Sequence, residues 1–216
     1  MPVQPPIRLG REAVPLWIID DAYPAPQALH AAAAAASLAA TTDDLYPGVR
    51  APAPGAWTDW LNRAVQAWPG LEQARVLRAD FAIATRDPAA LAPVQRIPHF
   101  DDADETIMAV VHYLCHPPHG GTSFHRQRAT GFERVTKARA PAWRQALAAD
   151  AARHGLPPAA YHTSDTAMFE RIGAAALRHN RLIVYPANCL HCGDVAGSWA
   201  SGDRLTITAL LRIDPA

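Results

Sequence analysis

The sequence predicts a protein of the α+β class, with its strands in an antiparallel sandwich or barrel of the jelly-roll kind. Helix-like segments concentrate before residue 70, and short strand-like segments follow one another after it. One further helical segment interrupts the strands. Elements segregated in this way favour a sheet-based core with helices packed against it, rather than alternating units of a parallel sheet.

The N-terminal part of the chain combines one strand with two helices. "VPLWIID", residues 14–20, is an apolar run of strand length. The alanine-rich segment 26–40 predicts a helix, because alanine has the highest helix propensity. Residues 46–52, "YPGVRAP", contain proline and glycine and predict a turn. Apolar residues recur at helical spacing over 56–68, which predicts a second helix with its tryptophans in the core.

The rest of the chain has the pattern of many strands with one helical insertion. Residues 106–114, "TIMAVVHYL", form a nearly continuous apolar run, which is typical of a strand buried on both faces. Residues 141–155 have proline near their start and glycine at their end, and this predicts a helix. The other expected strands cover residues 76–85, 120–125, 175–179, 181–186 and 204–213.

Composition excludes several classes of partner. The 216 residues include 20 Lys and Arg and 20 Asp and Glu, so no basic surplus favours nucleic acid or an acidic membrane surface. Three cysteines are too few, and odd in number, for a disulfide framework. The N-terminus lacks the pattern of a signal peptide, and no apolar run approaches about 18 residues. We therefore expect a soluble, cytoplasmic protein; the sequence does not predict its oligomeric state.

His99 and Asp101 stand two residues apart in "RIPHFDD", shortly before the buried strand. In extended backbone, residues two apart point to the same side, so these side chains share a face and Phe100 lies on the other. His191, in "YPANCLHCGD", is the candidate for a third ligand from a distant segment. Two histidines and one carboxylate on one side of an ion form the facial triad of non-haem Fe(II) oxygenases, which leaves positions open for a co-substrate and O₂.

Arg204 begins the last expected strand, "RLTIT", in which side chains alternate between two faces. Arg204 and Thr206 share one of these faces. A guanidinium beside a hydroxyl on an inward face can hold a carboxylate, because the planar Arg fork binds it bidentately. The alternative for Arg204 is an ion pair with a local acid such as Asp203 or Asp194.

The ordered set of motifs resembles the Fe(II)/2-oxoglutarate-dependent dioxygenases, most closely their prolyl-4-hydroxylase-like group. "PHFD", then "YL" and "GGTSF", then "YP" and "LH", and finally the strand that starts with Arg carry the likeness. It covers residues 76–213, with an insertion at about 126–172. The resemblance implies a single oxygenase domain built on a double-stranded β-helix (a cupin-like jelly roll), with residues 1–75 as N-terminal support.

The resemblance also assigns roles to individual residues. It implies that His99, Asp101 and His191 ligate Fe(II), and that these are the catalytic residues. It further implies that Arg204 pairs with the distal carboxylate of the co-substrate 2-oxoglutarate and that Thr206 adds a hydrogen bond.

Tyr113 would reach the same carboxylate; the alternative for Tyr113 is a place in the core. Because Asp101 occupies the carboxylate position, we expect hydroxylation or another oxidation by O₂ rather than halogenation. The substrate would be a small molecule, an amino acid or a peptide, with no nucleic acid and no membrane as partner.

Two other interpretations stay open at this point. Cys189 and Cys192 flank His191, and together with Cys115, His116 and His119 they could build a zinc site. The protein could also be a cupin-like metal-binding or ligand-binding protein without oxygenase activity. The remaining histidines, His125 and His162 among them, are expected to be ordinary polar residues, with His125 a candidate for the substrate mouth.

Overall fold

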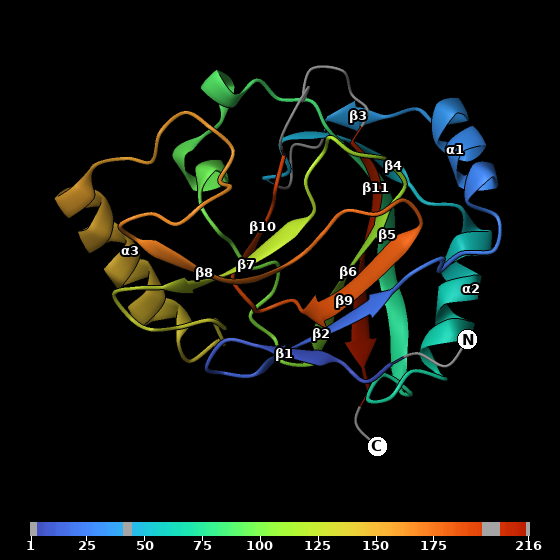
Figure 1. Ribbon diagram of the computed structural model, residues 1–216, viewed down its shortest axis with the longest axis horizontal. Coiled ribbons are helices and arrows are strands. Elements are labelled where there is room, and N and C mark those ends of the chain that lie inside the picture. The colour runs from blue at the N-terminus through green and yellow to red at the C-terminus, as the bar shows by residue number, and fades with distance from the viewer. Residues whose placement is uncertain (1–3, 41–44, 196–203, 215–216) are drawn as a thin grey trace.

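The computed structural model describes residues 4–40, 45–195 and 204–214, which form two antiparallel sheets and three α-helices (Figure 1). The larger sheet has, in spatial order, β1 (Ile7–Leu9), β2 (Val14–Ile19), β9 (Arg181–Pro186), β6 (Ile107–Tyr113), β11 (Leu205–Ile213), β5 (Ala74–Ala84), β4 (Gly48–Pro52) and β3 (Ala39–Ala40). The smaller sheet has β10 (His191–Gly193), β7 (Thr122–Gln127) and β8 (Phe169–Ala175). The helices are α1 (Pro26–Ala35), α2 (Gly55–Val65) and α3 (Ala140–His154).

Helices α1 and α2 pack on one face of the larger sheet (Figure 1). Trp57, Leu61 and Val65 recur every four residues along α2 and are completely buried, so one stripe of the helix faces the strands. The indole Nε1 of Trp57 donates to His112 Nδ1 of β6 over 3.1 Å. This bond ties the helix to a central strand of the sheet.

Strand β6 is buried on both faces, as its unbroken apolar sequence predicts. Met108 and Val110 point toward α1 and α2, whereas Ala109 and Tyr113 point toward the smaller sheet. Strand β11 beside it divides its residues differently. Its residue Ile207 faces the helices with Ala209 and Leu211, and the alternate residues face the space between the sheets.

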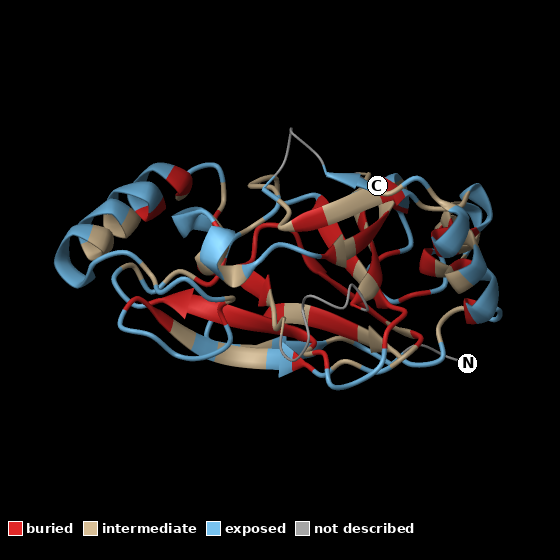
Figure 2. Ribbon diagram, turned by 90° about the horizontal axis from the view of Figure 1, so that it is seen from above, coloured by how far each residue is buried: buried red, intermediate tan, exposed pale blue. Residues whose placement is uncertain are grey.

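The smaller sheet covers part of the other face of the larger sheet, and α3 lies beyond it (Figures 1 and 2). Phe124 of β7 meets Tyr185 of β9 edge to face, with 5.0 Å between ring centroids. On the α3 side, Trp143 packs against Phe100. The two sheets therefore enclose a layer of side chains in which a cavity opens.

The first helix is shorter than the alanine-rich sequence predicts, because it ends at Ala35 rather than near residue 40. Ala36 is already extended, and Ala39 and Ala40 pair with Arg50 and Val49 of β4. Sheet pairing therefore overrides the intrinsic helix preference of alanine at this point.

The turn expected at residues 46–52 is wrong for most of its length, since residues 48–52 form β4 and pair with β5. Gly48 allows this pairing, because a Cβ there would lie 1.9 Å from the carbonyl oxygen of Ile83. The strand expected at residues 175–179 is also wrong. Strand β8 ends at Ala175, and the chain then turns through Asn180, whose φ of 59° is left-handed.

Residues before 76 contribute more to the larger sheet than the sequence predicts. Strands β1 to β4 all come from this part of the chain and are hydrogen-bonded in one sheet with β5, β6, β9 and β11. Helix α3 lies in the connection between β7 and β8. Among the described residues, no helix is long and apolar enough to cross a membrane.

Candidate metal centre and cavity

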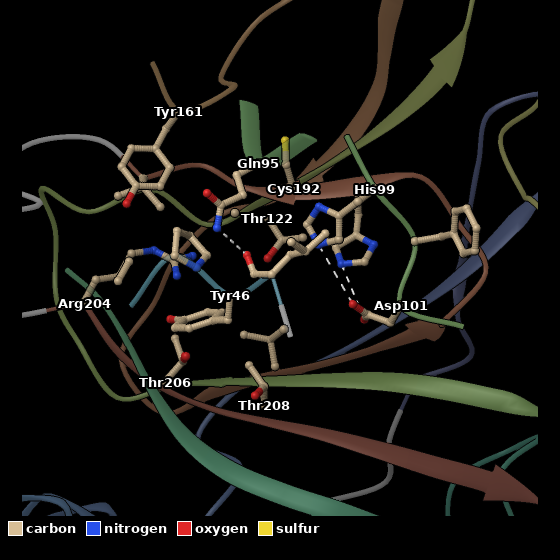
Figure 3. A pocket seen from close by; sticks show the side chains of 18 of the residues that line it. Tyr46, Gln95, His99, Asp101, Thr122, Tyr161, Cys192, Arg204, Thr206 and Thr208 are labelled. Atoms are coloured by element: carbon tan, nitrogen blue, oxygen red, sulfur yellow. Dashed lines mark hydrogen bonds and ion pairs between the residues drawn. The ribbon is translucent and has the colours of Figure 1, made fainter. Parts of the chain in front are cut away.

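His99, Asp101 and His191 lie together at the wall of the cavity between the sheets. Figure 3 shows His99 and Asp101 among the residues that line it. Asp101 is the centre of the group: its Oδ1 is 3.9 Å from His99 Nε2 and its Oδ2 is 3.6 Å from His191 Nε2. Two ligands bound side by side at about 2.0–2.2 Å from one ion stand roughly 3 Å apart. For the two pairs that include Asp101, shifts of about 1 Å or less would therefore bring the donors to metal-binding distances.

The local backbone explains why His99 and Asp101 share a face. His99 pairs with His191 in an antiparallel bridge, and Asp101 N donates to Ala187 O over 2.8 Å. Phe100 lies between them and packs against Trp143, with ring centroids 5.3 Å apart. The alternation expected from an extended backbone is therefore present.

The tautomer of His191 suits a ligand. Its Nδ1 lies 3.0 Å from the carbonyl oxygen of Cys189, which can only accept a hydrogen bond. We infer that the proton sits on Nδ1, so that Nε2 directs its lone pair toward Asp101. The ring is buried and packs 4.9 Å from the ring of Tyr185, which limits its rotation.

His99 is also suited to binding a cation. Desolvation, together with the neighbouring His191, lowers the pKa of His99 to about 4, although Asp101 acts in the opposite direction. Although the side chain is half exposed, its ring stands among closely spaced groups at the cavity wall. The imidazole is therefore neutral near pH 7, which is the form that binds metal ions.

Arg204 lies in the same cavity, and the structure describes no carboxylate paired with it. It is buried, with its Nη2 donating to Gly121 O over 2.9 Å and its Nε to Gly120 O over 3.3 Å. Of the two local acids considered for Arg204, Asp194 instead pairs with Arg171 over 3.2 Å. The other, Asp203, lies outside the described residues.

Thr206 and Tyr113 differ in their relation to the cavity. Thr206 lines it, and its hydroxyl donates to Ala82 O over 3.2 Å. Tyr113 is completely buried, and its hydroxyl donates to Thr122 Oγ1 over 2.7 Å. Within the described part of the chain the cavity lining includes Thr122 but not Tyr113, so a contact of Tyr113 with a ligand stays a prediction.

The cavity has a volume of about 390 Å³, within the usual range for small-molecule sites. Strand β11 forms one wall, and other strands together with loops far apart in the sequence form the rest. Among the lining residues that the sequence did not single out as site residues are Tyr46, Arg50, Tyr161 and His162. The guanidinium of Arg50 stacks on the ring of Tyr46 at 4.4 Å. Tyr46 and Tyr161 are aromatic residues close to prolines in the sequence, and this pattern was a signal for the segments that carry them.

The zinc site considered from the sequence does not form. In the described ranges, the groups of three or more close metal-ligating side chains include neither Cys115 nor Cys189, nor His116 nor His119. Cys192 instead stands with His125 and His162 in a second group. Those two histidines were taken as ordinary polar residues.

Several solved structures are similar to this chain. HygX from Streptomyces hygroscopicus, with nickel, 2-oxoglutarate and hygromycin B bound, matches with a TM-score of 0.50 at 11% identity, over 91% of this chain and 82% of that chain. The non-haem α-ketoglutarate-dependent epimerase SnoN from nogalamycin biosynthesis matches with a TM-score of 0.48 at 12% identity, over 91% and 76%. The likeness to HygX shows a common fold.

No curated protein matches the chain. A family model described as a family of unknown function, DUF6445, matches residues 3–211, which is nearly the whole chain. The two-sheet fold and the cavity described above thus give a structure to a family whose function is open. The chain belongs to the DUF6445 family.

Proposed function

We propose that this protein is an Fe(II)- and 2-oxoglutarate-dependent oxygenase that acts on a small molecule. The observation that carries the proposal is the presence, in one cavity, of a two-histidine, one-carboxylate group and a buried arginine for which the structure describes no acidic partner. A facial triad needs the first feature, and a co-substrate with two carboxylates needs the second.

In this proposal His99, Asp101 and His191 hold the iron and are the catalytic residues. Bound iron would supply the activation of O₂ and the oxidation of the substrate. The chain supplies the position of the donors. Backbone hydrogen bonds between His99 and His191 hold the two rings, and the Cys189 carbonyl keeps the His191 lone pair directed at the ion.

Arg204 would bind the distal carboxylate of 2-oxoglutarate. Its Nη2 and Nε already donate to glycine carbonyls, which hold the guanidinium in place before a ligand arrives. A buried guanidinium is costly without an anion, and a bound carboxylate would remove that cost. Thr206, on the same face of β11, would add a hydroxyl to this end of the cavity.

The cofactors, the type of fold and the subgroup of oxygenases are part of the same proposal. HygX, which has the same fold, was solved with nickel and 2-oxoglutarate bound and, in another structure, with iron bound. These bound groups support Fe(II) and 2-oxoglutarate as the cofactor and co-substrate of this chain. We further propose that the two sheets are the double-stranded β-helix of a single oxygenase domain and that α3 belongs to an insertion in it. Membership of the prolyl-4-hydroxylase-like group is the expectation from the sequence motifs.

The substrate space favours a small molecule over a long peptide. The lining includes the aromatic rings of Tyr46 and Tyr161 and the polar side chains of Arg50 and His162. Aromatic walls with a few polar groups are typical of small-molecule sites. We expect hydroxylation as the reaction.

The test uses the full chain, freed of metal and reloaded anaerobically with Fe(II). Calorimetry should then detect 2-oxoglutarate binding that depends on iron, and exposure to O₂ should produce succinate, slowly even without the substrate. Binding of iron without any binding of 2-oxoglutarate would reject the oxygenase. That result would leave the cupin-like binding protein as the function.

A further inference from the structure

Three buried side chains from three separate segments converge beside the cavity. They are His125 of β7, His162 of the loop between α3 and β8, and Cys192 of β10, and one potential ligand atom of each lies within 4.8 Å of the others. Their exposed fractions are 0%, 8% and 6%. Buried thiols and imidazoles gathered in this way form the donor set that Zn²⁺ prefers.

This group has its own donors, separate from the group around Asp101, because Cys192 and its neighbour His191 project from opposite faces of the smaller sheet, although Cys192 and His162 both also line the cavity. His191 pairs with Phe124 and Cys192 pairs with Ser123, and paired residues share a face while neighbours along a strand alternate. His125 follows two residues after Ser123 and so belongs to the face of Cys192. In Figure 3 the sulfur of Cys192 points away from Asp101.

The histidines of this group have unused bonding capacity. His125 Nδ1 and His162 Nε2 are buried, and neither has a hydrogen-bond partner among the described residues. An unpaired buried polar atom costs about 1–3 kcal/mol. A bound cation could give the unpartnered Nε2 of His162 a partner. At His125 the nitrogen near the thiol is Nε2, which lies 3.4 Å from Cys192 Sγ and 2.9 Å from Ser123 Oγ.

The surroundings resemble the outer shell of a metal site. Cys192 Sγ lies 3.4 Å from His125 Nε2 and 3.2 Å from Ser123 Oγ. Ser123 in turn donates to Asp194 over 2.6 Å, and Asp194 pairs with Arg171. Polar partners of this kind orient ligands and limit their movement.

We propose that His125, His162 and Cys192 form a second metal site, which takes Zn²⁺ or another divalent cation that favours sulfur and nitrogen. Binding replaces the S–H bond of Cys192 with a metal–sulfur bond and releases the proton to solvent. Three protein ligands leave a fourth position of a tetrahedral ion for water. The proposal does not depend on the oxygenase function.

The site would hold a wall of the cavity in place. His162 is its only ligand from the connection between α3 and β8, and its neighbour Tyr161 lines the cavity and donates to Arg86 O over 2.8 Å. The other two ligands come from paired strands of the smaller sheet. A bound cation would therefore fasten this loop to the sheet, so the ion has a structural role.

The experiment adds Co²⁺ alone to the metal-free full chain and records absorption. A cobalt ion bound to a thiolate has a near-ultraviolet charge-transfer band, which a site made only of histidines and a carboxylate cannot give. We expect this band in the wild type and its loss in Cys192→Ser. In His162→Asn the affinity for Co²⁺ should fall at least about tenfold, because loss of a ligand should cost no less than loss of an outer-shell partner. Circular dichroism checks that each variant is folded.

Two further variants locate the signal. Cys189→Ser, which removes a buried thiol on the other side of His191, should keep the band. Asp101→Ala should also keep the charge-transfer band, but it should lose the metal ion bound by His99, Asp101 and His191. Absence of the band in the wild type at saturating Co²⁺, or its persistence in folded Cys192→Ser, would overturn the second site. If His162→Asn is folded and binds Co²⁺ like the wild type, the three-ligand site is likewise rejected.

Discussion

The backbones of His99 and His191 exchange two hydrogen bonds, of 2.9 Å and 2.8 Å, although the residues come from segments far apart in the chain. Their rings stand 4.6 Å apart as a result. The two histidines of the proposed iron site are therefore placed by sheet-like pairing and not by a flexible loop. A site held in this way needs little reorganisation when a ligand binds.

Asp101→Ala should remove Fe(II) binding while leaving the fold intact. The carboxylate stands between both histidine nitrogens, and it is partly exposed, so its loss removes a donor without opening the core. We expect affinity to fall by more than the roughly 10–100-fold that outer-shell partners contribute. Anaerobic calorimetry measures the effect.

The matched control for this variant is Asp102→Asn. Asp102 is the next residue, and its Oδ1 accepts a hydrogen bond from Asp104 N, which the amide oxygen of Asn can also do. It should bind Fe(II) like the wild type. Equal iron affinity in Asp101→Ala and Asp102→Asn would remove Asp101 from the site.

Arg204→Ala should leave Fe(II) binding unchanged and weaken 2-oxoglutarate binding. Truncating one side of a buried, hydrogen-bonded charge pair costs about 2–5 kcal/mol. Arg204→Lys should lose less, because the charge stays and only the bidentate fork is lost. Calorimetry on the iron-loaded chain gives both affinities. Arg212→Ala, at the exposed far end of the same strand, is the control, and an effect of equal size there would contradict the assignment.

Tyr113→Phe separates the two roles considered for this tyrosine. Its hydroxyl is already engaged with Thr122, and burial raises its pKa to about 12, so it stays protonated. We expect the variant to lose about 1 kcal/mol of unfolding free energy, the usual net value of one hydrogen bond. Its 2-oxoglutarate affinity should be nearly unchanged; a marked loss would show that the hydroxyl reaches the co-substrate.

The stability of the metal-free protein should fall as the pH drops from about 6.5 to about 4. Trp57 donates to His112 Nδ1, so the ring is neutral, and burial lowers the pKa of His112 to about 4. Between these pH values the unfolded chain binds a proton that the folded chain does not, which favours unfolding. At about 1.36 kcal/mol per pKa unit, His112 contributes on the order of 3 kcal/mol to this change.

Urea unfolding at pH 7 and pH 5 measures that dependence. His112→Gln should be less stable at pH 7, because the bond to the indole is lost, but its stability should change less between the two pH values. His154→Gln, at the exposed end of α3, should keep the full pH dependence. An unchanged slope in His112→Gln would show that other groups carry the effect.

Local patterns in the sequence determined the central strands and part of the site. Strand β9 was predicted with its observed bounds, and β6 with one more residue at each end, because burial on both faces leaves an unbroken apolar run. The shared face of His99 and Asp101 followed from the two-residue period of extended chain alone. The prediction that Arg204 and Thr206 point to the same side of the chain followed from the same two-residue period.

The tertiary structure decided what depends on pairing between distant segments. The end of α1, strand β4 and the short strand β10 are set by hydrogen bonds to partners elsewhere in the chain, so propensity and turn residues misjudge or miss them. The meeting of His125, His162 and Cys192 has the same origin. Each residue is unremarkable in its own segment, and only the pairing of β7 with β10 and the path of the loop after α3 bring the three side chains together.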